Sequence, residues 1–101
     1  MRILVFFDLP RNTSLEVKDA NVFRKKLLKE GFLMLQESVY CKLVLNQTAL
    51  EYVKQRVKKH LPKCGSVMIL TVTEKQFAAM DICCDKFVSQ TVDTAKRLII
   101  L

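Results

Sequence analysis

The sequence predicts a single α+β domain of the ferredoxin-like type, spanning residues 1–101, with elements in the order β-α-β-β-α-β. Three observations predict it. Apolar runs typical of strands alternate with two stretches whose apolar residues recur at helical spacing. The chain has 101 residues, which is the size of one domain. Half of its residues are hydrophobic, which is enough for a buried core.

The first strand is predicted over residues 2–9, which read R-I-L-V-F-F-D-L, an almost continuous apolar run. Pro10 ends this strand, because proline has no N–H to donate to a sheet. Thr13 and Glu16 then form a T-x-x-E capping box, which predicts a helix that Gly31 ends. The apolar stripe of this helix is Val17, Ala20, Phe23, Leu27 and Leu28.

Residues 32–45 are extended again and are long for one strand. Glu37 and Ser38 interrupt the apolar run, so the region forms either two strands or one sharply bent strand. Thr48 and Glu51 make a second T-x-x-E pattern, which predicts the start of a second helix. Its apolar stripe is Leu50, Val53, Val57 and Leu61.

The last strand of the β-α-β-β-α-β pattern is predicted over residues 67–72, V-M-I-L-T-V. Residues 73–80 fit neither a helix nor a strand pattern. Residues 81–94 have no hydrophobic period and predict a loop, whereas residues 97–101, R-L-I-I-L, predict an extra C-terminal strand.

The strands are apolar on both faces, but two helices can cover only one face of a sheet. We therefore expect a homodimer in which sheet faces sheet. We also expect residues 80–101 to be exchanged between the two subunits of the dimer, because their apolar end would otherwise leave an unpaired strand edge.

The composition excludes some classes of protein and favours others. Lys and Arg total 17 against 10 for Asp and Glu, a formal net charge of +7, which favours polyanionic partners. No run reaches the roughly 18 apolar residues of a membrane-spanning helix, so no membrane association is expected. Neither a basic leader nor a cleavage pattern opens the chain, which predicts a cytoplasmic location.

The four cysteines are expected to be free thiols, because a reducing compartment does not favour disulfides. Zinc binding is the alternative. Cys83 and Cys84 are adjacent rather than spaced C-x-x-C, and His60 with Cys64 is one loose pair rather than four ligands. No glycine-rich phosphate loop and no nucleophile-and-base set is visible in the sequence.

Asp8 is the residue most informative about function. It is a carboxylate near the end of an apolar strand, where a charge is costly unless it is paired, hydrogen-bonded or bound to metal. One interpretation is a ligand of Mg²⁺, or of Mn²⁺ in its place. A two-fold axis would bring Asp8 of both subunits to one ion per dimer, which is therefore a candidate catalytic metal centre. The alternative is a strand-end acid that stabilises the following turn.

Basic residues on both predicted helices, with one after the first strand, are candidates for binding the phosphates of a duplex without reading bases. They are Arg11, Arg24, Lys25, Lys29, Arg56 and Lys59. Arg24 lies toward the apolar side of its helix and is expected at the edge of the core. The alternative is a solvated helix face. Stacking on single-stranded bases is not indicated, because the core is expected to hold Phe6, Phe7, Phe23 and Phe32.

Four blocks of sequence carry a family resemblance: M-R-I-L-V-F-F-D-L-P at the start, F-R-K-K-L-L-K-E-G-F, Q-E-S-V-Y-C-K-L-V-L-N and L-T-V-T-E-K-Q-F. In this order and spacing they resemble the CRISPR-associated Cas2 family, the small core protein of spacer acquisition. The last two blocks look most like members that accompany type II systems. The resemblance covers about residues 1–77.

The resemblance implies a ferredoxin-like homodimer held between two dimers of the CRISPR integrase protein during capture of foreign DNA. It also implies a Mg²⁺-dependent endonuclease acting on RNA or DNA. The family's metal aspartate falls on Asp8, and the Gln and Ser of its second-strand motif fall on Gln36 and Ser38. The basic pair of its first helix falls on Arg24 and Lys25.

Two functions from different classes are therefore expected. In the first, the protein is an adaptor that binds double-stranded DNA and bridges integrase dimers. In the second, it is a metal-dependent nuclease that acts alone on RNA or DNA and is centred on Asp8. The single acid and the large positive charge favour the adaptor, and the resemblance adds the nuclease.

Overall fold

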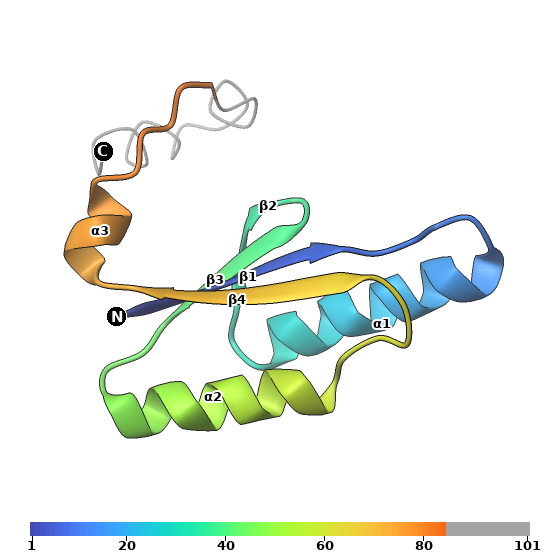
Figure 1. The fold of residues 1–101 in the computed structure, drawn as a ribbon, viewed down its shortest axis with the longest axis horizontal. Helices are drawn as coiled ribbons and strands as arrows, with labels where there is room; N and C mark the ends of the chain where they lie inside the picture. The colour runs from blue at the N-terminus through green and yellow to red at the C-terminus, as the bar shows by residue number, and fades with distance from the viewer. Residues whose placement is uncertain (85–101) are drawn as a thin grey trace.

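The computed structural model describes residues 1–84, which form a four-stranded antiparallel sheet with two long helices on one face (Figure 1). The strand order is β2-β3-β1-β4. The elements are β1 (Arg2–Asp8), α1 (Ser14–Lys29), β2 (Leu33–Gln36), β3 (Val39–Leu43), α2 (Gln47–Lys59), β4 (Ser66–Val72) and α3 (Glu74–Ala78). The predicted β-α-β-β-α-β order is confirmed. The predicted strand over 97–101 lies outside the described residues.

Strand β1 is the centre of the sheet, because it pairs with β3 on one side and with β4 on the other. Successive side chains of a strand point to opposite faces. Ile3, Val5 and Phe7 accordingly enter the core beneath the helices. The Phe7 ring lies edge-on to Phe23 of α1 and stacks on Tyr40 of the neighbouring strand β3, so the sheet and α1 meet at this residue.

Helix α1 begins as the capping box predicts. The Thr13 hydroxyl accepts a hydrogen bond from the Glu16 N–H at 3.1 Å, and the Glu16 carboxylate accepts one from the Thr13 N–H at 3.0 Å. Gly31 follows the helix with a φ of 96°, which favours glycine. The prediction of Leu28 in the apolar stripe is wrong, because that side chain is 49 % exposed.

Helix α2 begins at a different residue from the one predicted. Asn46 is its N-cap, and its side-chain oxygen accepts a hydrogen bond from the Ala49 N–H at 2.8 Å. Thr48 therefore lies inside the first turn and does not cap the helix. Leu61 was predicted in the apolar stripe but follows the end of the helix and is exposed. Leu50, Val53 and Val57 form the buried stripe as expected.

Residues 32–45 form two strands rather than one bent strand, with the turn at Glu37 and Ser38. The pairing of β2 with β3 shifts register between Met34 and Gln36. The Ser38 carbonyl accepts a hydrogen bond from the Phe7 N–H at 3.0 Å. This turn therefore lies beside the C-terminal end of β1.

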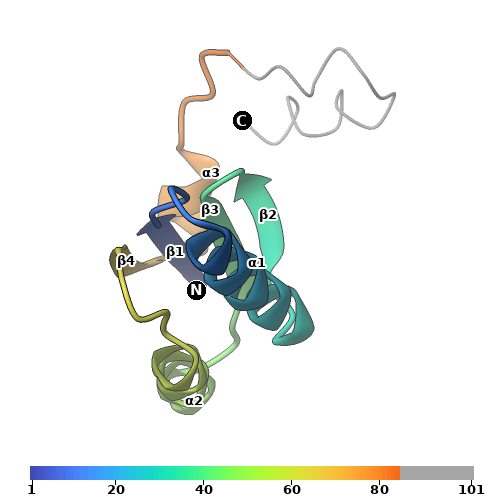
Figure 2. The same ribbon diagram turned by 90° about the vertical axis from the view of Figure 1, so that its right-hand side faces the viewer.

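Among residues 1–84, neither α1 nor α2 lies on the second face of the sheet, and only the short α3 is placed at one end of it, as Figure 2 shows. This second face carries Leu4, Phe6, Leu33, Leu43, Met68 and Leu70, by the alternation and register of the strands. Met68 is 63 % and Leu70 is 50 % exposed. Phe6 is half-buried on this face, so its prediction as a core residue is wrong. We call this surface the open sheet face.

Helix α3 covers one end of the open sheet face. It begins with a capping box at Thr73, in the region that fitted neither helix nor strand. Arg2 of β1 donates to the Glu74 carboxylate at 2.9 Å, and its guanidinium lies 4.5 Å from the centre of the Phe77 ring. The hydrogen bond with Arg2 lowers the pKa of Glu74. Within residues 1–84, no helix is long and apolar enough to cross a membrane.

Candidate functional site

Asp8 is the last residue of β1 and pairs in register with Ser66 of β4. The alternation along β1 puts its side chain on the open sheet face, at the end away from Arg2 and α3. The carboxylate is exposed, so the expectation of a charge inside a buried strand is wrong. Water can solvate the ionised group here, and the charge needs no buried partner.

Gly65 lies against the backbone of Asp8 and Leu9. Its φ is 103°, and a Cβ at this position would lie 2.8 Å from the Asp8 carbonyl oxygen and 2.7 Å from Leu9 Cδ2. Glycine is therefore the residue that this close approach requires. The loop before β4 and the end of β1 fix each other's position.

Three of the other predicted site residues lie near the same end of the sheet. Ser38 lies there through the hydrogen bond between its carbonyl and the Phe7 N–H. Gln36 ends β2 on the other side of the same turn, and Arg11 follows Asp8 by three residues in the connection to α1. All three are exposed.

The residues around Asp8 do not complete a metal site within one chain. Within residues 1–84, no group of three or more His, Cys, Asp or Glu side chains is placed to hold a metal ion. One carboxylate is a weak ligand set for Mg²⁺, which is held in proteins by carboxylates together with water and phosphate. Asp8 fits such an ion only if a second copy of the chain supplies another ligand.

The cysteines are all free thiols in the described part of the chain. Cys41 is buried on the open sheet face of β3, and burial raises the pKa of its thiol. Cys64, Cys83 and Cys84 are exposed.

The remaining predicted basic residues lie on the helical layer. Lys25 and Lys29 of α1 and Lys59 of α2 are exposed and available to a ligand. Arg24 is half-buried, and its Nε is buried with no hydrogen-bond partner among the described residues. Its position at the edge of the core agrees with the prediction.

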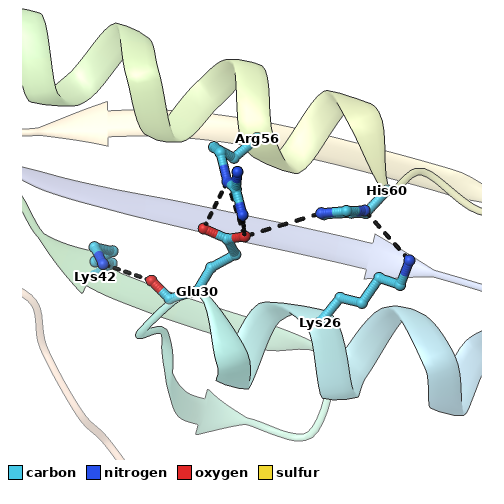
Figure 3. Close-up of polar contacts among 5 residues, drawn as sticks. All are labelled: Lys26, Glu30, Lys42, Arg56 and His60. Atoms are coloured by element: carbon cyan, nitrogen blue, oxygen red, sulfur yellow. Dashed lines mark hydrogen bonds and ion pairs between the residues drawn. The ribbon is translucent and has the colours of Figure 1, made fainter.

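Arg56 is engaged with the chain itself rather than free. Its Nη2 donates to Glu30 Oε2 at 2.6 Å, and its Nε also donates to that carboxylate (Figure 3). This bond lowers the pKa of Glu30 and raises that of Arg56. Arg56 therefore joins the C-terminal ends of α1 and α2, which reduces its freedom to bind a phosphate.

The sequence prediction missed two residues beside this ion pair. Lys26 Nζ lies 3.4 Å from His60 Nδ1, and His60 Nε2 lies 3.9 Å from Glu30 Oε2. A signal was present, because Lys26 precedes Glu30 by four residues and Arg56 precedes His60 by four. That spacing puts each pair on one helix face.

Tyr52 also corrects an expectation. Aromatic residues were not expected among the basic ones, but Tyr52 is 62 % exposed on α2 and its ring centre lies 5.8 Å from the Arg56 guanidinium. A tyrosine can keep its hydroxyl in water while its ring lies beside a cation.

The predicted site is thus divided between two layers. One end of the sheet holds Asp8, Gln36, Ser38 and Arg11. The carboxylate of Asp8 lies on the open sheet face. The other basic residues belong to α1 and α2, which cover the opposite face (Figure 2).

Comparison with known proteins identifies the family. Residues 1–80 match the family model described as CRISPR associated protein Cas2. A protein of Treponema denticola is 46 % identical over 101 residues, and one of Ligilactobacillus salivarius is 41 % identical over 101 residues, each match covering both chains completely. A Streptococcus mutans protein is 51 % identical over 80 residues, 79 % of this chain and 73 % of its own. All three carry the name CRISPR-associated endoribonuclease Cas2. The chain belongs to the CRISPR-associated Cas2 family.

Proposed function

We propose that this protein is a homodimeric adaptor of CRISPR spacer acquisition, which holds double-stranded DNA on its helical layer and bridges dimers of the integrase protein. Membership of the Cas2 family supports the biological setting. The net charge of +7 supports a polyanionic ligand. Lysines on exposed helix faces suit contacts with phosphates, which are independent of base sequence.

The separation of the two layers is the observation that carries this proposal. A duplex held by Lys25, Lys29 and Lys59 would lie against the helices, whereas the Asp8 side chain belongs to the other face of the sheet. Phosphates bound on the helical layer are therefore not presented to Asp8 of the same chain. This arrangement suits holding DNA better than cutting it.

The open sheet face supports the homodimer. Its exposed leucines and methionine form an apolar surface that no long helix covers within residues 1–84. Pairing two such faces would bury them and leave both helical layers outward, where one duplex and the integrase dimers can reach them. The bridging of integrase dimers rests on family resemblance and on this outward arrangement.

Duplex binding is tested by fluorescence anisotropy with a labelled DNA duplex of random sequence at several salt concentrations. Lys25→Gln should weaken binding and reduce the slope of log K against log salt by about one, because one phosphate contact is lost. Lys75→Gln is the matched control, since it removes the same charge from α3, on the other side of the sheet. Equal effects of the two variants would contradict a binding surface on the helices.

A Mg²⁺-dependent endoribonuclease is the second candidate function. The name of the relatives, CRISPR-associated endoribonuclease Cas2, and the exposed carboxylate of Asp8 favour it. In a dimer, the Asp8 residues of both subunits would hold one Mg²⁺ or Mn²⁺ ion, which would supply Lewis-acid chemistry toward a phosphodiester. Asp8 would bind the ion, and the turn at Ser38 together with the close approach of Gly65 would keep the strand end in place.

Asp8→Asn tests this candidate, because it removes the charge and keeps the size of the side chain. We expect it to abolish Mg²⁺-dependent cleavage of RNA or DNA while melting temperature and duplex binding stay unchanged. Spacer acquisition by the same variant separates the two functions: acquisition without cleavage supports the adaptor. Cleavage at the wild-type rate would assign the activity to another residue.

A further inference from the structure

The C-terminal ends of α1 and α2 carry a basic cluster that the proposed duplex contacts do not use (Figure 3). Lys26 Nζ lies 3.4 Å from His60 Nδ1. Lys42 donates to the main-chain carbonyl of Glu30 at 2.5 Å, and Arg56 binds the Glu30 carboxylate. One carboxylate therefore lies among four groups that carry, or can carry, a positive charge.

The contact between Lys26 and His60 has a defined direction. A lysine ammonium can only donate, so Nδ1 accepts and the ring proton of a neutral imidazole lies on Nε2. Nε2 is the nitrogen nearer to Glu30, at 3.9 Å from Oε2. A further proton on Nδ1 would bring two positive charges within 3.4 Å of each other, which repel unless an anion lies between them.

We propose that Lys26 and His60 form a subsite for one phosphate of the nucleic-acid backbone, and that His60 takes up a proton when the phosphate binds. The inference rests on the proposed function and adds a proton-linked regulation to it. Lys26 is exposed and the His60 side chain is 26 % exposed, so both can be reached from solvent. A single phosphate can accept one hydrogen bond from Lys26 Nζ and another from a protonated His60 Nδ1.

Charged groups from three elements lie around His60. The charged groups that face the imidazole are Lys26 and Glu30 of α1 and Arg56 of its own helix, with Lys42 of β3 on the far side of Glu30. His60 is also the C-cap of α2, where the helix dipole favours a positive charge. If a bound phosphate raises the affinity of His60 for a proton, then a proton on His60 raises the affinity for the phosphate by the same factor.

A structural role alone does not account for the pair. Arg56 and Glu30 already join the two helices through three side-chain hydrogen bonds. A bidentate pair of this kind fixes distance and orientation without help. Lys26 and His60 lie beside the ion pair of Arg56 and Glu30. Because the Lys26 side chain is exposed, the two residues are available to a ligand.

The experiment measures duplex binding at about pH 5.5 and about pH 7, the range in which an imidazole changes its charge. His60 is the only histidine in the chain. We expect the wild type to bind several-fold more tightly at the lower pH, and His60→Gln to lose this difference while it still binds at the higher pH. Lys26→Gln should weaken binding at both pH values, and more than Lys75→Gln does.

Calorimetric titration of the wild type with the same duplex, in two buffers of different ionisation enthalpy, reports the proton directly and needs no variant to fold. Proton uptake near pH 7 supports the inference. Equal pH dependence of the wild type and His60→Gln, or no proton uptake, would overturn it and leave the proposed adaptor function standing. If the wild type binds no duplex at either pH, the proposed function itself is wrong.

Discussion

Glu30 is an acidic residue whose charge is stabilised by a basic neighbour, Arg56. It is the C-cap of α1, where the negative end of the helix dipole disfavours an acid. Arg56 offsets this cost by donating hydrogen bonds from Nε and Nη2 to the carboxylate, the shorter one, from Nη2, at 2.6 Å. The result is an ion pair between residues 26 apart in sequence, which links α1 to α2.

The first prediction concerns the acid stability of this pair. The hydrogen bond from Arg56 lowers the pKa of Glu30 below the ordinary value of 4.5 in the folded protein. The stability that the pair of Glu30 and Arg56 contributes is therefore complete at pH values above the pKa of Glu30 in the unfolded chain. It is lost as the pH falls through the lower pKa of Glu30 in the folded protein. Glu30→Gln should be less stable than the wild type at neutral pH, and the difference should shrink as the pH falls below 4.5.

Urea unfolding midpoints of both proteins across this pH range provide the measurement. Glu51→Gln is the control, because Glu51 is a more exposed carboxylate whose nearest lysine, Lys54, lies 3.7 Å away. A difference between wild type and Glu30→Gln that stays constant down to pH 3 would show that the carboxylate charge is not what stabilises the pair.

At the scale of elements, α2 illustrates the choice between two capping residues. Asn46 and Thr48 are both residue types that cap helices well. The structure uses Asn46, whose side chain accepts the Ala49 N–H. Gln47 then lies inside the helix, and its side-chain amide donates a hydrogen bond to the Glu51 carboxylate at 3.1 Å. Glu51 therefore accepts from a side chain one turn earlier in the helix and does not form a capping box with Thr48.

The second prediction follows from this assignment. Asn46→Ala should lower the free energy of unfolding by about 1 kcal/mol, because an N-terminal N–H of the helix loses its acceptor. Thr48→Ala should change it by less than about 0.5 kcal/mol, since the Thr48 side chain is exposed and caps nothing. Chemical denaturation of the two variants gives the comparison, and a larger effect of Thr48→Ala would contradict the observed cap.

At the scale of the whole molecule, α1 and α2 cover one face of the sheet, and the described part of the chain leaves most of the other face uncovered. Met68 lies on the open sheet face and is 63 % exposed. We expect this face to pair with a second copy of the chain. Met68→Glu should weaken that dimer by at least about a hundredfold, because each copy would bury an unpaired carboxylate.

Sedimentation velocity at micromolar concentration measures this effect. Leu45→Glu is the control, because Leu45 is 85 % exposed but lies between β3 and α2 rather than on the open sheet face. The control should remain as dimeric as the wild type. A wild-type protein that is folded and monomeric at this concentration would contradict the sheet-to-sheet dimer.

Local patterns were sufficient to predict β1, β4 and the two long helices, whereas residues 73–80, which form α3, fitted no pattern. The apolar run of β1, the helical spacing around Phe23 and the capping box at Thr13 each depend on neighbours within a few residues, and each is confirmed. Asp8 was recognised for the same reason, as one polar residue in an apolar strand. Its position at the strand end was therefore predictable, although its exposure was not.

Only the tertiary structure decided which face of each element is covered. Alternation predicts that Phe6 and Phe7 point to opposite faces, but both look alike in sequence, and the packing of α1 and α2 determines that Phe7 is the buried one. The contacts of Glu30 with Arg56 and His60 likewise join residues that are distant in the chain. Such contacts depend on how two helices lie on one sheet, and periodicity within either helix contains no information about the other.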